Sequence, residues 1–82
     1  DHPHRYELAL DDLTWADIVS ALIRHGIGTA LAYIDKDDEV ICHPPTNEEV
    51  EGKGLIVLVK SAETPTVEAV EEALARYRRF LA

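Results

Sequence analysis

Two kinds of hydrophobic periodicity alternate along the chain and predict four strands and two helices. The segment Arg5–Leu10 alternates apolar with polar or small residues, which is typical of a strand with one buried face, and two aspartates are expected to end it. Residues 28–34 and 39–43 are rich in apolar side chains and are joined by four polar residues, so they predict a hairpin. The run Leu55–Val59 has no polar alternation, and we expect it to be a central strand buried on both faces.

The two predicted helices combine amphipathic spacing with residues that favour helix ends. Thr14 and Asp17 are spaced as in a capping box, in which each side chain accepts a hydrogen bond from the other residue's backbone N–H. Gly26 is expected to end this helix in a left-handed conformation. The second helix should run from about Thr66 to Leu81, with glutamates early and arginines late, as the helix dipole favours. The apolar stripes are Trp15, Ile18, Val19, Leu22 and Ile23 in the first helix, and Val67, Val70, Leu74, Tyr77 and Leu81 in the second.

The apolar pattern breaks abruptly at His43-Pro44-Pro45. Proline has no backbone N–H and a fixed φ, so this pair cannot continue a sheet ladder. The acidic stretch that follows is expected to be a connection, and the two glycines on either side of Lys53 are expected to form a turn. The chain should then return to the sheet at Gly54.

The predicted element order is therefore β-α-β-β-β-α, in one domain that covers residues 1–82. We expect a small α+β fold in which a mainly antiparallel sheet, or a partial barrel, is flanked by helices. A chain of 82 residues buries only about 60–65% of the surface that it exposes when unfolded, so a partner chain would add stability. Because the sequence contains no methionine, we expect the domain to have been cut from a longer protein.

Charge and composition narrow the classes of partner. The chain has a formal net charge of −8, and residues 35–51 hold seven acidic side chains against one lysine. Nucleic acids and anionic lipid surfaces require basic patches, so the distribution argues against both and permits cations or basic protein surfaces. No apolar run approaches the roughly 20 residues of a membrane span, so we expect no direct membrane insertion. The single cysteine favours a reducing, cytoplasmic setting.

Four clustered carboxylates form the candidate ligand site: Asp35, Asp37, Asp38 and Glu39. Carboxylate oxygens suit a hard divalent cation. The spacing is not that of an EF-hand, because Val40 stands where the loop's glycine belongs. The alternative is a solvated hairpin turn, since aspartate favours turns.

Two further residues with reactive side chains, Cys42 and His43, lie where the apolar pattern stops. The simplest interpretation of Cys42 is a buried, inert thiol in an apolar strand. His43 could be a ligand or a group that titrates near neutral pH, or simply a strand-end residue placed by the prolines. Neighbouring residues in a strand point to opposite faces, so these two do not form a nucleophile and its base. We therefore expect no enzymatic activity.

Four segments occur in an order that resembles a known family. Leu13-Thr14-Trp15-x-x-Ile18 resembles its helix opening, and Gly28–Ile34 resembles the apolar strand after that helix. His43-Pro44-Pro45 resembles its Asn-Pro-Pro stop, and Glu51–Leu58 resembles the glycine-containing entry to its last strand. The family is the C-terminal, TrkA-C type subdomain of RCK domains, which regulate potassium channels and potassium-uptake systems. Positions 43, 54 and 35 depart from its usual Asn, Asp and basic residue, so no ligand site is transferred.

The resemblance implies a non-catalytic regulatory domain that forms a homodimer on the cytoplasmic side of the cell membrane. It would act on the membrane pore domain of its parent protein. Family members sense a cation or a nucleotide, so a divalent cation or an adenine nucleotide is the regulatory ligand implied. The first hypothesis is therefore a ligand-sensing, dimerising domain that couples ligand binding to gating of a potassium channel or transporter. The alternative is a purely structural dimerisation module with no small ligand.

Overall fold

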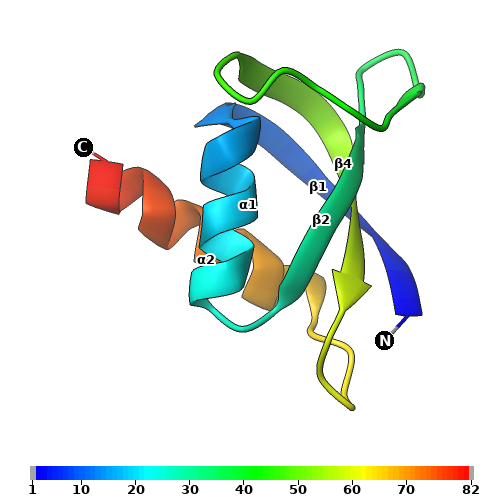
Figure 1. Cartoon of the computed structure of the whole chain (residues 1–82), viewed down its shortest axis with the longest axis vertical. Helices are drawn as coiled ribbons and strands as arrows, with labels where there is room; N and C mark the ends of the chain where they lie inside the picture. Colours follow the sequence, from blue (N-terminus) through cyan, green and yellow to red (C-terminus); the bar gives the residue numbers. More distant parts are fainter. Residues whose placement is uncertain (1, 82) are drawn as a thin grey trace.

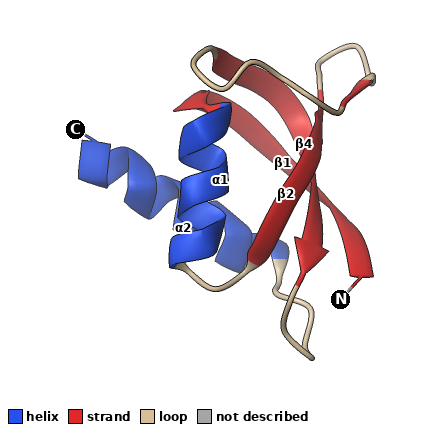
Figure 2. Ribbon diagram, in the orientation of Figure 1, coloured by secondary structure: helices blue, strands red, loops and turns tan. Residues whose placement is uncertain are grey.

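A computed structural model describes residues 2–81 and has the predicted order of elements. Its elements are β1 (His2–Thr14), α1 (Trp15–Arg24), β2 (Gly28–Ile34), β3 (Val40–Ile41), β4 (Glu49–Val59) and α2 (Val67–Leu81). The strands form one antiparallel sheet in the order β1-β4-β2-β3. The sheet curls into a half-barrel accompanied by the two helices, which confirms the predicted α+β fold (Figures 1 and 2).

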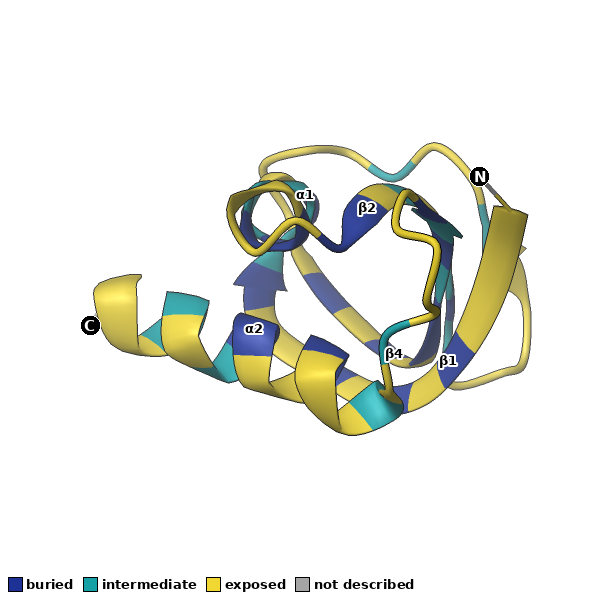
Figure 3. Ribbon diagram, turned by 90° about the horizontal axis from the view of Figure 1, so that it is seen from below, coloured by how far each residue is buried: buried dark blue, intermediate teal, exposed yellow. Residues whose placement is uncertain are grey.

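The core lies between one face of the sheet and the two helices. Tyr6, Leu8 and Leu10 are all buried there, which confirms the alternation predicted for the first strand. Among residues 2–81 the buried side chains are aliphatic or aromatic, those of Tyr6 and Trp15 included, so burial of apolar surface is the main source of stability in the interior. Figure 3 colours the buried residues of the strands and helices dark blue. The fully buried core side chains of the helices are Ile18, Ala21, Leu22 and Val70, with Ala73 and Leu74 nearly so.

Both helices begin with a side-chain cap, and the cap of α1 is the capping box that the sequence predicts. The Asp17 N–H donates to Thr14 Oγ1 at 3.2 Å, and the Thr14 N–H donates to Asp17 Oδ2 at 3.0 Å, which completes the capping box. Gly26 follows α1 with a φ of 67°, the left-handed conformation expected of it. At the start of α2, the Ala69 N–H donates to Thr66 Oγ1 at 3.1 Å. These bonds satisfy N–H groups that have no partner within the helix.

β1 is longer than predicted, because it continues through Asp11 and Asp12 to Thr14. Its register against β4 shifts twice, before and after Leu10, and Asp12 has a φ of 60°. Such bulges add a residue to one strand, bend it and increase its twist. They allow Leu10 and Leu13, three positions apart, both to be buried in the core. The two aspartates therefore mark a bulge, and the prediction that they end the strand was wrong.

β4 begins at Glu49, so the prediction that the chain returns to the sheet at Gly54 was wrong. Gly52 and Gly54 lie inside this strand and do not form the predicted turn. A Cβ atom on Gly52 would lie 2.5 Å from the carbonyl oxygen of Ile34 in β2. One on Gly54 would lie 2.9 Å from Cδ1 of Ile34. The glycines thus allow β2 to approach β4 closely, which is a common reason for glycine in a strand.

β4 is central, as predicted, but only one of its faces is fully buried. Leu55, Val57 and Val59 have no exposed surface, whereas Ile56 and Leu58 on the opposite face are half-buried. The buried side chains of both helices belong to the same core as Leu55, so the helices cover that face alone. The expectation of two buried faces was therefore wrong.

The predicted hairpin is present, but its second strand is short. β3 consists of Val40 and Ile41, which pair with Ile34 and Tyr33. The expected strand over residues 39–43 therefore ends before Cys42.

We expect Leu55→Ala to lower the free energy of unfolding by about 2–5 kcal/mol, because Leu55 is fully buried on the core face of β4. Leu31→Ala is the matched control, since this leucine lies in the neighbouring strand β2 with 39% of its surface exposed. It should cost less than about 1 kcal/mol. Urea unfolding followed by circular dichroism measures both. Equal losses would contradict the position of the core.

Candidate functional site

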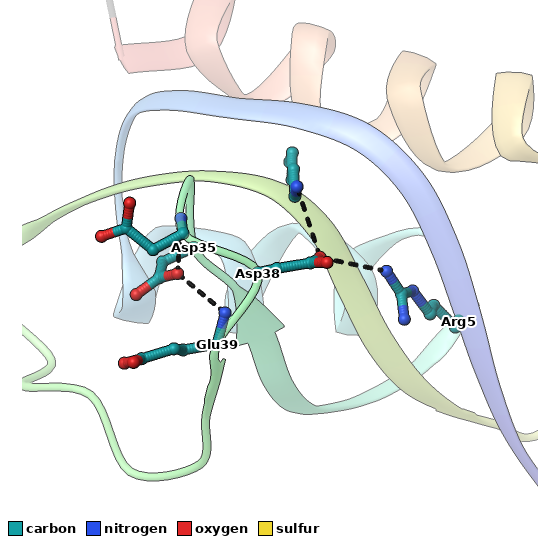
Figure 4. A network of polar contacts seen from close by, with 6 residues as sticks. Arg5, Asp35, Asp38 and Glu39 are labelled. Carbon is teal, nitrogen blue, oxygen red and sulfur yellow. Dashed lines mark hydrogen bonds and ion pairs between the residues drawn. The ribbon is translucent and has the colours of Figure 1, made fainter.

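The loop that joins β2 to β3 is closed by the side chain of Asp35. Its Oδ1 accepts hydrogen bonds from the backbone N–H groups of Asp37 and Glu39, both at 2.9 Å (Figure 4). Two backbone bonds reinforce the loop, from the Asp35 N–H to the Glu39 carbonyl and from the Asp38 N–H to the Asp35 carbonyl. Aspartate commonly stabilises turns in this way. The carboxylate of Asp35 therefore stabilises the conformation of this loop.

Asp38 contacts cations on two other strands. Its Oδ1 lies 3.3 Å from Lys53 Nζ in β4 and 3.8 Å from Arg5 Nη2 in β1. Figure 4 shows this side chain directed away from Asp35 and toward Arg5. All three side chains are more than half exposed, so each pair contributes about 0–1 kcal/mol to stability. The contacts hold the loop over the sheet.

The four predicted cation ligands, Asp35, Asp37, Asp38 and Glu39, do not converge. Asp35 binds backbone N–H groups, Asp38 pairs with Lys53 and Arg5, and Glu39 points elsewhere (Figure 4). Within the described part of the chain, no three His, Cys, Asp or Glu side chains are arranged to hold a metal ion. The geometry supports the alternative of a solvated hairpin turn, and a cation site here stays a prediction.

Cys42 and His43 are both exposed, and both lie in the loop that follows β3. The prediction of a buried thiol was wrong, because the apolar run ends its sheet pairing at Ile41. The prolines turn the chain toward α1, where the Ala16 N–H donates to the Thr46 carbonyl at 3.2 Å. This bond ties the loop to the first turn of α1.

A hollow of about 490 Å³ lies beside Tyr6, between β1 and the start of α2. The Tyr6 hydroxyl donates to the Pro65 carbonyl oxygen at 2.8 Å, and His2 Nε2 lies 3.1 Å from Thr64 Oγ1. Burial raises the pKa of the Tyr6 phenol. These contacts fix the connection before α2 against β1.

A second hollow, of about 310 Å³, lies where the last turns of α1 and α2 meet. Its lining includes Arg24, whose guanidinium lies 4.8 Å from the centre of the Phe80 ring. Phe80 also lies 5.8 Å from Tyr77 between ring centres, yet 65% of its surface is exposed. From the sequence, Phe80 stands out only because it lies off the buried apolar stripe of α2. The contact between its ring and Arg24 of α1 could not be predicted from the apolar pattern.

No family of known proteins, no curated protein and no solved structure matches the chain. The resemblance to RCK domains therefore stays a prediction from the motifs. Neither helix described between residues 2 and 81 is long and apolar enough to cross a membrane.

We expect Asp35→Ala to lower the free energy of unfolding by about 1–2 kcal/mol, because the N–H groups of Asp37 and Glu39 would lose their acceptor. Asp35→Asn keeps an amide oxygen at the same position and should cost less than half as much. Urea unfolding of the two variants measures the difference. Equal losses would show that the negative charge, and not the acceptor, matters at this position.

Tyr6 should make the domain less stable in alkaline solution. Its folded pKa is raised by burial above the unfolded value of about 10, so at high pH the unfolded chain binds fewer protons than the folded one. Stability is then fully present below the unfolded pKa and is lost as pH rises through the folded pKa. Tyr6→Phe should cost about 1 kcal/mol at neutral pH and should flatten the alkaline loss. Urea unfolding from neutral pH upward measures this slope, and an unchanged slope would contradict the assignment to Tyr6.

Proposed function

We propose that this chain is a non-catalytic regulatory domain of a potassium channel or potassium-uptake transporter. In this proposal it dimerises on the cytoplasmic side of the membrane and couples the binding of a ligand to gating. The observation that carries it is the agreement between the described fold and the fold implied by the motifs. The resemblance implies a small α+β module, and its four segments lie in order at the start of α1, in β2, in the loop after β3 and in β4, whereas the long helix α2 is not a constant part of the family.

The distribution of polar groups supports a domain that works through its surface. Aliphatic and aromatic side chains fill the interior described between residues 2 and 81. In the loop between β2 and β3, Asp37, Asp38 and Glu39 are exposed to water and Asp35 is half-buried. The side chains of Cys42 and His43 are also exposed. Preorganised catalytic groups act most strongly where water is excluded. Shape, surface charge and contact with other chains are therefore the properties that this domain offers.

Coupling to a gate requires a ligand that distinguishes two arrangements of the dimer. A ligand bound between two copies would favour one subunit geometry, and the pore domain would respond to that geometry. A ligand that binds both arrangements equally would shift nothing. The candidates are a divalent cation and an adenine nucleotide.

The second candidate function is a structural dimerisation module without a small ligand. The contacts of the loop between β2 and β3 favour this alternative. Asp35 accepts hydrogen bonds from backbone N–H groups, and Asp38 forms ion pairs with Lys53 and Arg5. Under this alternative the carboxylates shape the loop, and the fold serves only to join protein chains.

Sedimentation velocity and isothermal titration calorimetry test the proposal. We expect the chain to sediment as a dimer and to release or absorb heat on addition of Ca²⁺, Mg²⁺ or an adenine nucleotide. A strict monomer that is indifferent to all of these would contradict it.

Replacement of Asp35, Asp37 and Asp38 by asparagine separates the two candidates. Ca²⁺ or Mg²⁺ binding that is lost in this variant, while its circular dichroism spectrum is retained, favours the sensing domain. A dimer without measurable binding in either protein favours the structural module.

A further inference from the structure

β1 is an edge strand, and part of its free edge is uncovered. The sheet order β1-β4-β2-β3 gives β1 a single neighbour, although the strand is 13 residues long. At its far end α2 closes the edge, because the Arg78 guanidinium donates to the Asp11 carbonyl at 3.2 Å. Nearer its beginning, the hollow of about 490 Å³ lies between residues 4–7 and the start of α2. An open strand edge of this kind can pair with a strand of another chain.

The backbone groups of Arg5 and Glu7 face this open edge. The Tyr6 carbonyl oxygen lies 3.3 Å from the position that a Cβ atom of Gly54 would occupy, so it faces β4. Successive residues of a strand direct their backbone groups to opposite sides, so the N–H and C=O groups of Arg5 and Glu7 face outward. Pro3 has the same orientation, which is where an edge strand accommodates proline. Within residues 2–81, neither outward N–H bonds to the backbone of a helix or loop.

The side chains on this edge complement those of a second copy. Arg5 and Glu7 are two positions apart, so both project from the face of the sheet opposite the core that Tyr6 enters. Both are exposed, and Glu7 forms no ion pair within residues 2–81. In an antiparallel pair centred on Tyr6, Arg5 of each copy lies directly opposite Glu7 of the other. Opposite charges at directly opposed positions stabilise a strand pair.

The backbone selects the same register. Outward-facing residues must lie opposite one another to exchange hydrogen bonds. A pair centred on Arg5 would bring two arginines together, and one centred on Glu7 would bring two glutamates together. A pair centred on His4 would use Pro3, which has no N–H to donate. The register centred on Tyr6 avoids all three faults, and it is symmetric about a two-fold axis, as a dimer of identical chains requires.

Charged residues and proline on an edge strand can also prevent pairing. That explanation fits Pro3, which bounds the open segment. It does not fit the two charges, because residues of one sign would repel every copy, whereas Arg5 and Glu7 attract each other across the edge. The other edge of the sheet is protected more simply, since β3 has two residues and Pro44-Pro45 follows it closely.

We propose that a second copy of this chain pairs antiparallel with residues 5–7 of β1, about a two-fold axis at Tyr6, and joins the two sheets into one. This inference rests on the proposed function, because it names the surface through which the domain dimerises. The partner is identified by its chemistry: it is an extended strand that offers outward backbone groups and the same two charges in reverse order.

Charge reversal tests the register. We expect Arg5→Glu and Glu7→Arg each to raise the dissociation constant of the dimer at least about tenfold, because like charges would lie opposite one another. Sedimentation equilibrium at low ionic strength measures the constant. An equimolar mixture of the two variants should recover the dimer. Mixing cannot restore the pair between Arg5 and Asp38 within a chain, so recovery reports a contact between chains.

Lys36→Glu is the matched control for Arg5→Glu. It changes the net charge by the same amount, and its 71% exposed side chain lies in the loop between β2 and β3. It should leave the dissociation constant unchanged. All the substituted residues are exposed, so circular dichroism should show every variant folded.

Amide hydrogen exchange of the wild-type chain tests the backbone pairing without any substitution. The N–H groups of Arg5 and Glu7 should exchange at least about tenfold more slowly in the dimer than in dilute, monomeric protein. The Tyr6 N–H is the control, because it faces β4 and should be protected at both concentrations. Arg5 and Glu7 amides that exchange equally fast in the dimer and the monomer would overturn the inference.

The remaining outcomes separate this inference from the proposed function. A wild-type dimer that persists in both charge variants would overturn the inference and leave the proposed function standing. Variants that are weakened alone and stay weakened when mixed would also overturn the inference. A wild-type monomer would overturn both. A dimer that responds to the charge exchange as expected, but binds neither a divalent cation nor an adenine nucleotide, would support the inference and contradict the sensing function.

Discussion

The register of β4 is the constraint on which the rest of the domain depends. This strand pairs with β1 along nearly its whole length and with β2 over its second half. Leu55, Val57 and Val59 are fully buried on its core face. A shift of one residue would move all three to the face that the helices leave uncovered. Because both helices pack on these side chains, the positions of α1 and α2 are set by the same register.

The curvature of the sheet follows from irregular backbone on both sides of this pairing. The bulges of β1 allow Leu10 and Leu13 to reach the core together, and Gly52 and Gly54 allow Ile34 of β2 to pack against β4. A bent, twisted sheet closes part of a barrel, and its helices then cover one side only. The covered side is a single apolar core, and the far ends of the helices are left without a layer beneath them.

Much of this fold could be predicted from local sequence signals, because they act over a few residues. The capping box of Thr14 and Asp17 is one example, and the alternation that buries Tyr6 is another. The errors lie where a local signal has two meanings. Glycine marks both turns and close strand approach, so the start of β4 was misplaced. The ion pairs of Asp38 and the position of Arg24 over Phe80 join distant segments, and no spacing within one element reveals them.

The small size of the domain bears on its function. A chain this short cannot cover every apolar surface that its elements carry. Apolar side chains remain on the open sheet face, at Ile56 and Leu58, and at the helix ends, at Phe80 and Leu81. Ile56 and Leu58 are half-buried between neighbouring strands, whereas Phe80 and Leu81 are exposed on a helix that is acidic in its first half and basic in its second. Apolar contact supplies most of the attraction in an interface, and complementary charge selects the partner and its orientation. On α2 these two conditions are met on different faces, because Leu81 continues the buried stripe of Val70 and Leu74, whereas Glu72 and Arg79 lie on the opposite, exposed face.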